Sequence, residues 1–204
     1  MTKHASADDR PIKVGVIADL TGPISFVGVA NANVARMVVG DINAKGGLLG
    51  REVELCLEDG ESSDAVAAAK AAKLVALDVD VILGGIYSST RQAIKGPAVQ
   101  VGKKLYIYPE QYEGEESDPL IFCTGPVPAQ QLDLFIPWLM QRTGAKRFYL
   151  PSADYIWPHT MNRRVRELVT ANDGEIVGEE YFPLDHADYQ ATVEHIASTI
   201  VDQS

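Results

Sequence analysis

The stretch Ile12–Leu20, with the sequence IKVGVIADL, decides the fold class of this chain. Its β-branched residues place Val14, Val16 and Ala18 on one face, a pattern that is typical of a buried strand. A loop follows, and apolar residues at helical spacing then predict a helix over Asn31–Ala44. A strand that leads through a loop into an amphipathic helix is the repeating unit of a parallel α/β sheet.

The same alternation recurs along the rest of the chain. It predicts strands over Arg51–Glu58 (near a sheet edge), Val79–Leu83, Lys104–Tyr108, Leu120–Thr124, Lys146–Leu150 and Glu175–Phe182. It predicts helices over Ala65–Leu77, Ser88–Val101 with a kink or boundary at Pro97, Gln130–Arg142, His159–Asn172 and Tyr189–Val201. The expected fold class is therefore α/β, with two doubly wound parallel-sheet lobes.

The polar stretch over residues 113–119 is the predicted boundary between these lobes. We expect a disordered leader over residues 1–11, an N-terminal lobe over 12–119 and a partial C-terminal lobe over 120–204. The second lobe holds only two full strand–helix repeats after its first strand, so it looks incomplete. Either this is a fragment of a longer two-lobed chain, or it is a naturally shortened variant.

Composition excludes several classes of function. The 204 residues are 46% hydrophobic, and 18 basic against 28 acidic residues give a net charge of −10, which disfavours nucleic acid and anionic membranes as partners. No stretch is apolar enough to span a membrane, and the N-terminus lacks the apolar core of a secretory signal. The chain is thus either cytosolic or the product of signal removal. Scattered cysteines and histidines support no metal site.

Two stretches carry the candidate binding chemistry: Tyr108–Gly114 (YPEQYEG) and Asp154–Pro158 (DYIWP). Each follows a predicted strand and places aromatic and polar side chains at its carboxyl end, where open α/β sheets bind small ligands. Neither stretch offers a nucleophile beside a base. They are interpreted as walls of a pocket for a small polar molecule.

Three further motifs, Asp19–Pro23 (DLTGP), Asp41–Arg51 (DINAKGGLLGR) and Gly84–Ser89 (GGIYSS), give the chain a family resemblance. It resembles the type I periplasmic binding proteins of the leucine/isoleucine/valine-binding branch, from Ile12 to about Val201. YPEQYEG and SADYIWP make it most similar to the amide- and urea-binding group, which includes substrate-binding components of ABC importers and a cytosolic amide sensor. The resemblance implies two α/β lobes with the ligand between them.

The resemblance also implies a set of ligand-binding residues. On the first lobe these are Ser88 with its neighbours Tyr87 and Ser89, then Tyr108 and Glu110; on the second they are Tyr155 and Trp157. Glu110 replaces a small hydroxyl residue of the group, so the ligand would carry an ammonium, an amidinium or several N–H donors. The alternatives are structural: Ser88 caps a helix, the aromatic residues pack, and Glu110 is a solvated loop charge.

The expected function is that of a solute-binding protein, or its N-terminal portion, which binds a small amide-, urea- or amino-acid-like ligand. Its partners would be the membrane subunits of an ABC transporter, in the periplasm if a signal was removed. The alternative is a cytosolic ligand sensor that regulates a partner protein. No cofactor is expected. An enzyme is disfavoured, because the sequence has no G-x-S-x-G elbow, no G-x-G-x-x-G and no P-loop.

Overall fold

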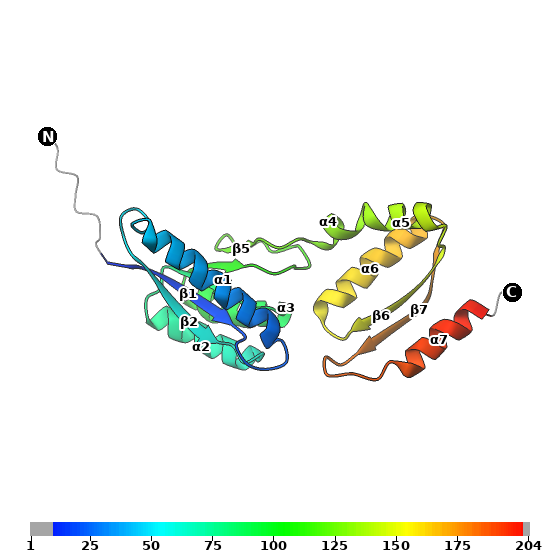
Figure 1. Cartoon of the computed structure of the whole chain (residues 1–204), viewed down its shortest axis with the longest axis horizontal. Helices are drawn as coiled ribbons and strands as arrows, with labels where there is room; N and C mark the ends of the chain where they lie inside the picture. Colours follow the sequence, from blue (N-terminus) through cyan, green and yellow to red (C-terminus); the bar gives the residue numbers. More distant parts are fainter. Residues whose placement is uncertain (1–9, 202–204) are drawn as a thin grey trace. The chain divides into compact units, whose positions relative to one another are not determined.

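A computed structural model describes residues 10–201 and shows two compact units (Figure 1). The first unit contains the chain up to residue 110 together with residues 116–125, and the second contains residues 111–115 and the chain from 126 onward. The expected leader over residues 1–11 lies largely outside the described residues. Arg10, however, is described, and its guanidinium pairs with the Asp80 carboxylate at 2.6 Å.

The first unit is a five-stranded parallel sheet in the order β2-β1-β3-β4-β5. Its elements are β1 (Ile12–Ala18), α1 (Ser25–Ala44), β2 (Val53–Asp59), α2 (Asp64–Ala76), β3 (Val81–Gly84), α3 (Ser88–Lys95), a π-helical turn (Gly96–Val101), β4 (Leu105–Tyr108) and β5 (Ile121–Cys123). The order reverses at β1, which confirms the doubly wound parallel sheet. The expectation that the second strand lies at a sheet edge is also confirmed.

Alternate residues of β1 face opposite layers of helices. Val16 and Ala18 pack with Ala32 of α1 in one buried cluster. Gly15 faces the other way, and a Cβ atom there would lie 2.9 Å from the Leu74 side chain of α2. Figure 1 shows α1 and α2 on opposite sides of this sheet.

Several boundaries differ from the predicted ones, and two of the differences change the interpretation. α1 begins at Ser25, whereas the sequence predicted a start at Asn31. The prediction was late because the exposed apolar residues Phe26 and Val29 obscure the helical periodicity of the first turns. The strand predicted to open the second lobe is β5, which instead pairs with β4 at the edge of the first sheet. The predicted lobe boundary after residue 119 is therefore corrected. Pro97 is confirmed as a boundary, since α3 ends at Lys95 and a π-helical turn follows.

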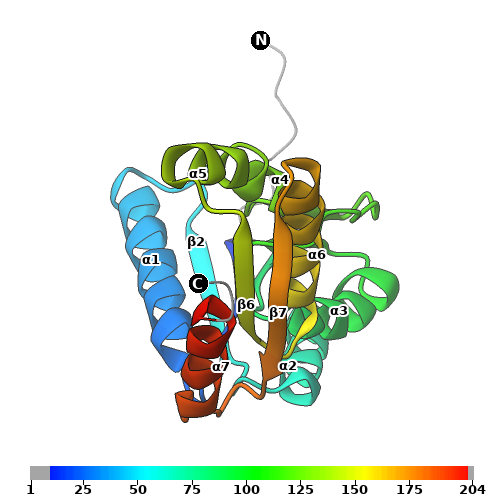
Figure 2. The same cartoon turned by 90° about the vertical axis from the view of Figure 1, so that its right-hand side faces the viewer.

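The second unit is built on a two-stranded parallel sheet, β6-β7. Its elements are α4 (Pro128–Leu132), α5 (Phe135–Thr143), β6 (Arg147–Ala153), α6 (Ile156–Ala171), β7 (Glu175–Phe182) and α7 (Gln190–Val201). The predicted helix over Gln130–Arg142 is two helices, α4 and α5. Val165 and Val169 of α6 form a buried core with Leu132, Ile136 and Met140, and Figure 2 shows α6 and α7 flanking the strand pair.

The described residues were also compared with the requirements of a membrane span, a metal site and a disulfide. None of the helices described is long and apolar enough to cross a membrane. Within residues 10–201 no group of three or more histidine, cysteine or acidic side chains could hold a metal ion. Cys56 and Cys123 are free thiols on β2 and β5, the two opposite edges of the first sheet.

Candidate functional site

The turn between β3 and α3 is a sharp one that only glycine permits. Gly84 and Gly85 have φ angles of 126° and 77°, in the left-handed region that side chains disfavour. A Cβ atom on Gly84 would also lie 1.9 Å from the carbonyl oxygen of Ile17. The chain therefore passes close beside β1 at this point and enters α3 at Ser88.

Two buried tyrosines of β4 donate hydrogen bonds to backbone carbonyls of this turn. The Tyr106 hydroxyl donates to the carbonyl oxygen of Gly84 at 2.9 Å, and the Tyr108 hydroxyl donates to that of Ile86 at 2.6 Å. Burial raises the pKa of Tyr106 well above its usual value, so its hydroxyl remains a donor. In a trans peptide the C=O and N–H groups point in opposite directions, so the carbonyl bound by Tyr108 directs the N–H of Tyr87 away from that ring.

The surroundings of Tyr108 show what its side chain contacts within the first unit. Its side chain is fully buried, its hydroxyl is bound to a backbone carbonyl, and its ring lies 4.9 Å from the guanidinium carbon of Arg91. The Tyr108 hydroxyl thus holds the turn that leads to Ser88. The sequence placed it correctly at a strand's carboxyl end but could not show which way it points.

The three predicted residues around Ser88 open helix α3. Tyr87 is its half-buried N-cap residue and Ser88 its buried first residue. The Ser89 hydroxyl donates to the Asp64 carboxylate at 3.2 Å, and Thr90 donates to the same oxygen at 2.7 Å. Asp64 is the first residue of α2, so one carboxylate joins the first turns of two helices.

A carboxylate that the sequence analysis missed, Asp59, ties together the loops that follow β1 and β2. Its two oxygens accept hydrogen bonds from the N–H of Leu20 at 2.9 Å, the N–H and hydroxyl of Thr21 at 3.3 and 2.9 Å, and the N–H of Glu61 at 2.8 Å. Burial opposes its ionisation, but these hydrogen bonds outweigh that effect and lower the pKa of Asp59. We call Asp19, Thr21, Asp59 and Ser62, which link the two loops, the loop clamp.

Asp19 is the buried member of this loop clamp. It is only 1% exposed, and its Oδ1 atom accepts from the N–H of Ser62 at 3.1 Å. Burial is the main reason that its pKa is raised, and the nearby Asp59 and Asp64 charges add to the shift. The signal for this residue was its place directly after β1, at the carboxyl end of a central strand.

Glu110 has a hydrogen-bond partner within the first unit. Its carboxylate accepts a hydrogen bond from Nδ2 of Asn31 at 2.8 Å, and Asn31 belongs to α1. Asn31 lies in the helix that covers the opposite face of the sheet from α2 and α3. A bond to a neutral amide within the unit also weakens the inference of a cationic ligand.

The two predicted aromatic residues of the second unit open helix α6. Tyr155 is its half-buried N-cap residue, whose N–H donates to the carbonyl of Ala153 at 3.1 Å. Trp157, the second residue of α6, is 6% exposed. Beside them, the His159 ring stacks on Tyr181 with centroids 3.7 Å apart and contacts the Asp154 carboxylate at 2.8 Å.

Comparison with known proteins identifies a family and several relatives. Residues 12–203 match the family model of the periplasmic binding protein domain. The Leu/Ile/Val-binding protein BraC3 of Rhizobium johnstonii is 40% identical over 79 residues, which are 38% of this chain and 21% of that protein. The Leu/Ile/Val-binding protein of Escherichia coli K12 is 34% identical over 88 residues, 43% of this chain and 23% of that protein.

Solved structures show the same fold. The branched-chain amino acid transporter substrate binding protein LivJ of Streptococcus pneumoniae, in complex with isoleucine, superposes with a TM-score of 0.78 at 23% identity, over 92% of this chain and 54% of that one. A fatty acid ABC transporter substrate-binding protein of Thermomonospora curvata gives a TM-score of 0.82 at 20% identity, over 96% and 50%. The chain thus spans about half the length of these structures.

Proposed function

Because this chain belongs to the periplasmic binding protein domain family, we propose that it is the N-terminal portion of an ABC importer's substrate-binding protein, and that its ligand is a small amino acid. The family is non-enzymatic, and the related proteins named for leucine, isoleucine and valine favour an amino acid over the amides and ureas that the sequence motifs suggested. The importer's membrane subunits and a periplasmic location belong to the same proposal.

One observation carries the choice of ligand: the glycine turn and the first turn of α3 form an N–H-rich end backed by two buried tyrosines. The first N–H groups of a helix have no acceptor within the helix, and the helix dipole is positive there. A carboxylate suits such an end. Ser88 is the first residue of this helix.

The rigidity of this end supports the proposal. Tyr106 and Tyr108 hold the carbonyls of the turn, and Asp64 joins α3 to α2 through Ser89 and Thr90. A site that is held in place before binding loses little conformational freedom when the ligand arrives. Ser88 and Tyr87 are therefore the proposed ligand contacts on this unit, with Tyr108 and Ser89 as positioning residues. Tyr155 and Trp157 stay predictions.

The test is a thermal-shift and calorimetry series on the full chain with L-leucine, 3-methylbutylamine, acetamide and urea. L-Leucine should stabilise the chain, and 3-methylbutylamine, which has the same side chain and amine but no carboxylate, should bind at least about tenfold more weakly. Ser88→Ala should weaken L-leucine binding, and the exposed Ser117→Ala serves as the matched control. Equal binding of the amine, or no stabilisation by any amino acid, would refute the proposal.

A further inference from the structure

The carboxyl group of Asp19, directly after β1, is enclosed within the first unit. The residue is 1% exposed. A Cβ atom on Gly60, in the loop after β2, would lie 2.4 Å from the Oδ1 atom of Asp19, so the backbone of that loop passes directly against the carboxyl group. An ionised carboxylate in such a place needs hydrogen-bond donors or a cation in exchange for the water that it loses.

The hydrogen bonds of Asp19 do not meet that need. Its Oδ1 atom accepts from the N–H of Ser62 at 3.1 Å, whereas its buried Oδ2 atom accepts from none of the described residues. Asp59, the other carboxylate of the loop clamp, accepts four hydrogen bonds. Neighbouring carboxyl groups in environments this different favour different protonation states. The ionised form suits Asp59, and the protonated form suits Asp19.

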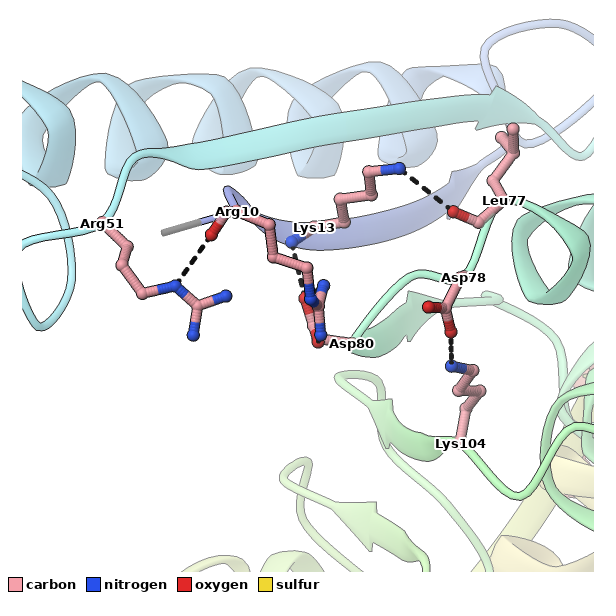
Figure 3. Close-up of polar contacts among 7 residues, drawn as sticks. All are labelled: Arg10, Lys13, Arg51, Leu77, Asp78, Asp80 and Lys104. Atoms are coloured by element: carbon pink, nitrogen blue, oxygen red, sulfur yellow. Dashed lines mark hydrogen bonds and ion pairs between the residues drawn. The ribbon is translucent and has the colours of Figure 1, made fainter. Parts of the chain in front are cut away.

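The charges around Asp19 are of its own sign. Burial raises the pKa of Asp19, and the carboxylates of Asp59 and Asp64 add to that shift. Among the described residues, no cation forms an ion pair with it. Asp80, directly before β3 at the other end of the sheet, shows the opposite arrangement. Figure 3 shows the guanidinium of Arg10 against it, with contacts of 3.0 and 2.6 Å to its two oxygens.

The turn from β3 to α3 lies beside the same end of β1. The N–H of Gly85 donates to the carbonyl oxygen of Ile17 at 3.1 Å, two residues before Asp19. Burial raises the pKa of Tyr87, the N-cap residue of α3, and the charge of Asp19 adds to that shift, so the two side chains interact electrostatically. Asp64 accepts hydrogen bonds from two hydroxyl groups of the first turn of α3. The proposed binding end of α3 therefore lies within the fields of two protein carboxyl groups.

A ligand carboxylate at this end of α3 would add a further negative charge near Asp19, Asp59 and Asp64. Asp59 has four donors and Asp64 has two, whereas Asp19 has one. Asp19 therefore loses the least hydrogen bonding when it is neutralised. We propose that Asp19 takes up a proton when an amino acid binds with its carboxylate at the first turn of α3, and so sets the pH dependence of the affinity. This inference rests on the proposed function, because it needs an anionic ligand group at that turn.

The coupling between ligand and proton has a definite sign. If the ligand favours protonated Asp19, protonation favours the ligand by the same factor. The pKa of Asp19, already raised in the unbound chain, is then higher still in the bound chain. The affinity should rise as the pH falls from the bound-state pKa to the unbound-state pKa, and stay level below that value, where Asp19 is protonated in both states.

The test is a calorimetric titration of the full chain with L-leucine at about pH 7.5 and about pH 5. Wild type should bind about fivefold more tightly at the lower pH. Asp19→Asn, which has the shape of the protonated group and no charge, should bind equally at both values, with the affinity that wild type has at the lower pH. Histidines also titrate in this range. Asp41→Asn, on the exposed side of α1, should keep the wild-type dependence.

A second measurement needs no variant. At about pH 6, the heat of binding in two buffers of different ionisation enthalpy gives the number of protons taken up, and wild type should show a net uptake. L-Leucine binding without proton uptake, or with the same pH dependence in wild type and Asp19→Asn, would overturn the inference and leave the proposed function standing. Absence of L-leucine binding at every pH would refute the proposed function, and the inference would fall with it.

Discussion

The loop clamp makes a quantitative prediction for the variant Asp59→Ala. The change removes the acceptor of four hydrogen bonds, from the N–H groups of Leu20, Thr21 and Glu61 and from the Thr21 hydroxyl. A hydrogen bond to a charged group contributes about 1.5–3 kcal/mol, but exposed donors recover most of it from water. Only the Leu20 donor is partly buried, so the expected loss of unfolding free energy is about 2–3 kcal/mol.

The pH dependence of this loss has a definite sign. The folded-state pKa of Asp59 is lowered, so its carboxylate stabilises the folded chain at a pH above the ordinary aspartate value. That contribution disappears as the pH falls through the lowered folded-state pKa. The gap between wild type and Asp59→Ala should therefore be full at pH 7 and shrink below about pH 4.

Urea denaturation measures both quantities. With a slope of about 2 kcal/mol per molar urea, the midpoint of Asp59→Ala should fall by about 1 M at pH 7. Far-UV circular dichroism suits this measurement, because both tryptophans, Trp138 and Trp157, lie in the second unit and their fluorescence does not report the first. Asp41→Ala, on the exposed side of α1, is the control. Superimposed wild-type and Asp59→Ala curves at pH 7, or a gap of undiminished size at pH 3, would refute the reasoning.

Three further predictions concern the same unit. Asp19→Asn removes a buried carboxyl group whose raised pKa makes its ionisation destabilising. The variant should therefore be more stable than wild type at a pH above the Asp19 pKa and equally stable in acid. Urea midpoints at pH 3 and 7 check this. Tyr108→Phe removes the hydrogen bond to the Ile86 carbonyl and should lower the unfolding free energy by about 1–3 kcal/mol, measured the same way. Gly28→Ala would place a Cβ atom 2.0 Å from the carbonyl oxygen of Asp19, so it should cost at least about 1–3 kcal/mol, and an unchanged midpoint would contradict the close approach.

Much of the fold could be predicted because strand and helix periods are local. Val14, Val16 and Ala18 alternate in sequence and pack together in the structure, with Val16 and Ala18 buried against α1. The predicted strand over Glu175–Phe182 is β7, with the same bounds. Pro97 was identified as a boundary because its ring removes a backbone donor, and the helix changes character beside it.

The errors arose where pairing between distant segments decides the outcome. β5 is only Ile121–Cys123, and its place depends on β4, not on its own composition. A polar stretch between two strands is typical of a boundary between lobes. Here, however, residues 111–115 belong to the second unit and residues 116–125 belong again to the first. Sequence periodicity contains no information on which sheet a short edge strand joins.

The candidate site shows the same division between position and direction. Ser88 and Tyr108 were placed correctly at the carboxyl ends of strands, since that follows from the order of elements. The direction of a side chain depends on partners that the sequence does not identify. Tyr108 donates to the carbonyl of Ile86, and Glu110 accepts from Asn31, which precedes it by 79 positions.

The loop clamp explains why this end of the first sheet is rigid in spite of unfavourable backbone angles. Glu61 and Ser62 both have left-handed φ angles, 54° and 52°, which cost about 1–3 kcal/mol each for residues other than glycine. Their N–H groups donate to Asp59 and Asp19, so two carboxylates hold the strained pair. Because β1 lies between β2 and β3, the loops after β1 and β3 meet where the strand order reverses, which is the place where open α/β sheets bind ligands. The strained backbone at Glu61 and Ser62 is held in place before a ligand binds, which favours a preformed binding surface at this end of the sheet. Asp59→Ala would release that backbone. The variant should therefore bind the amino acid more weakly, even though Asp59 is not a proposed ligand contact.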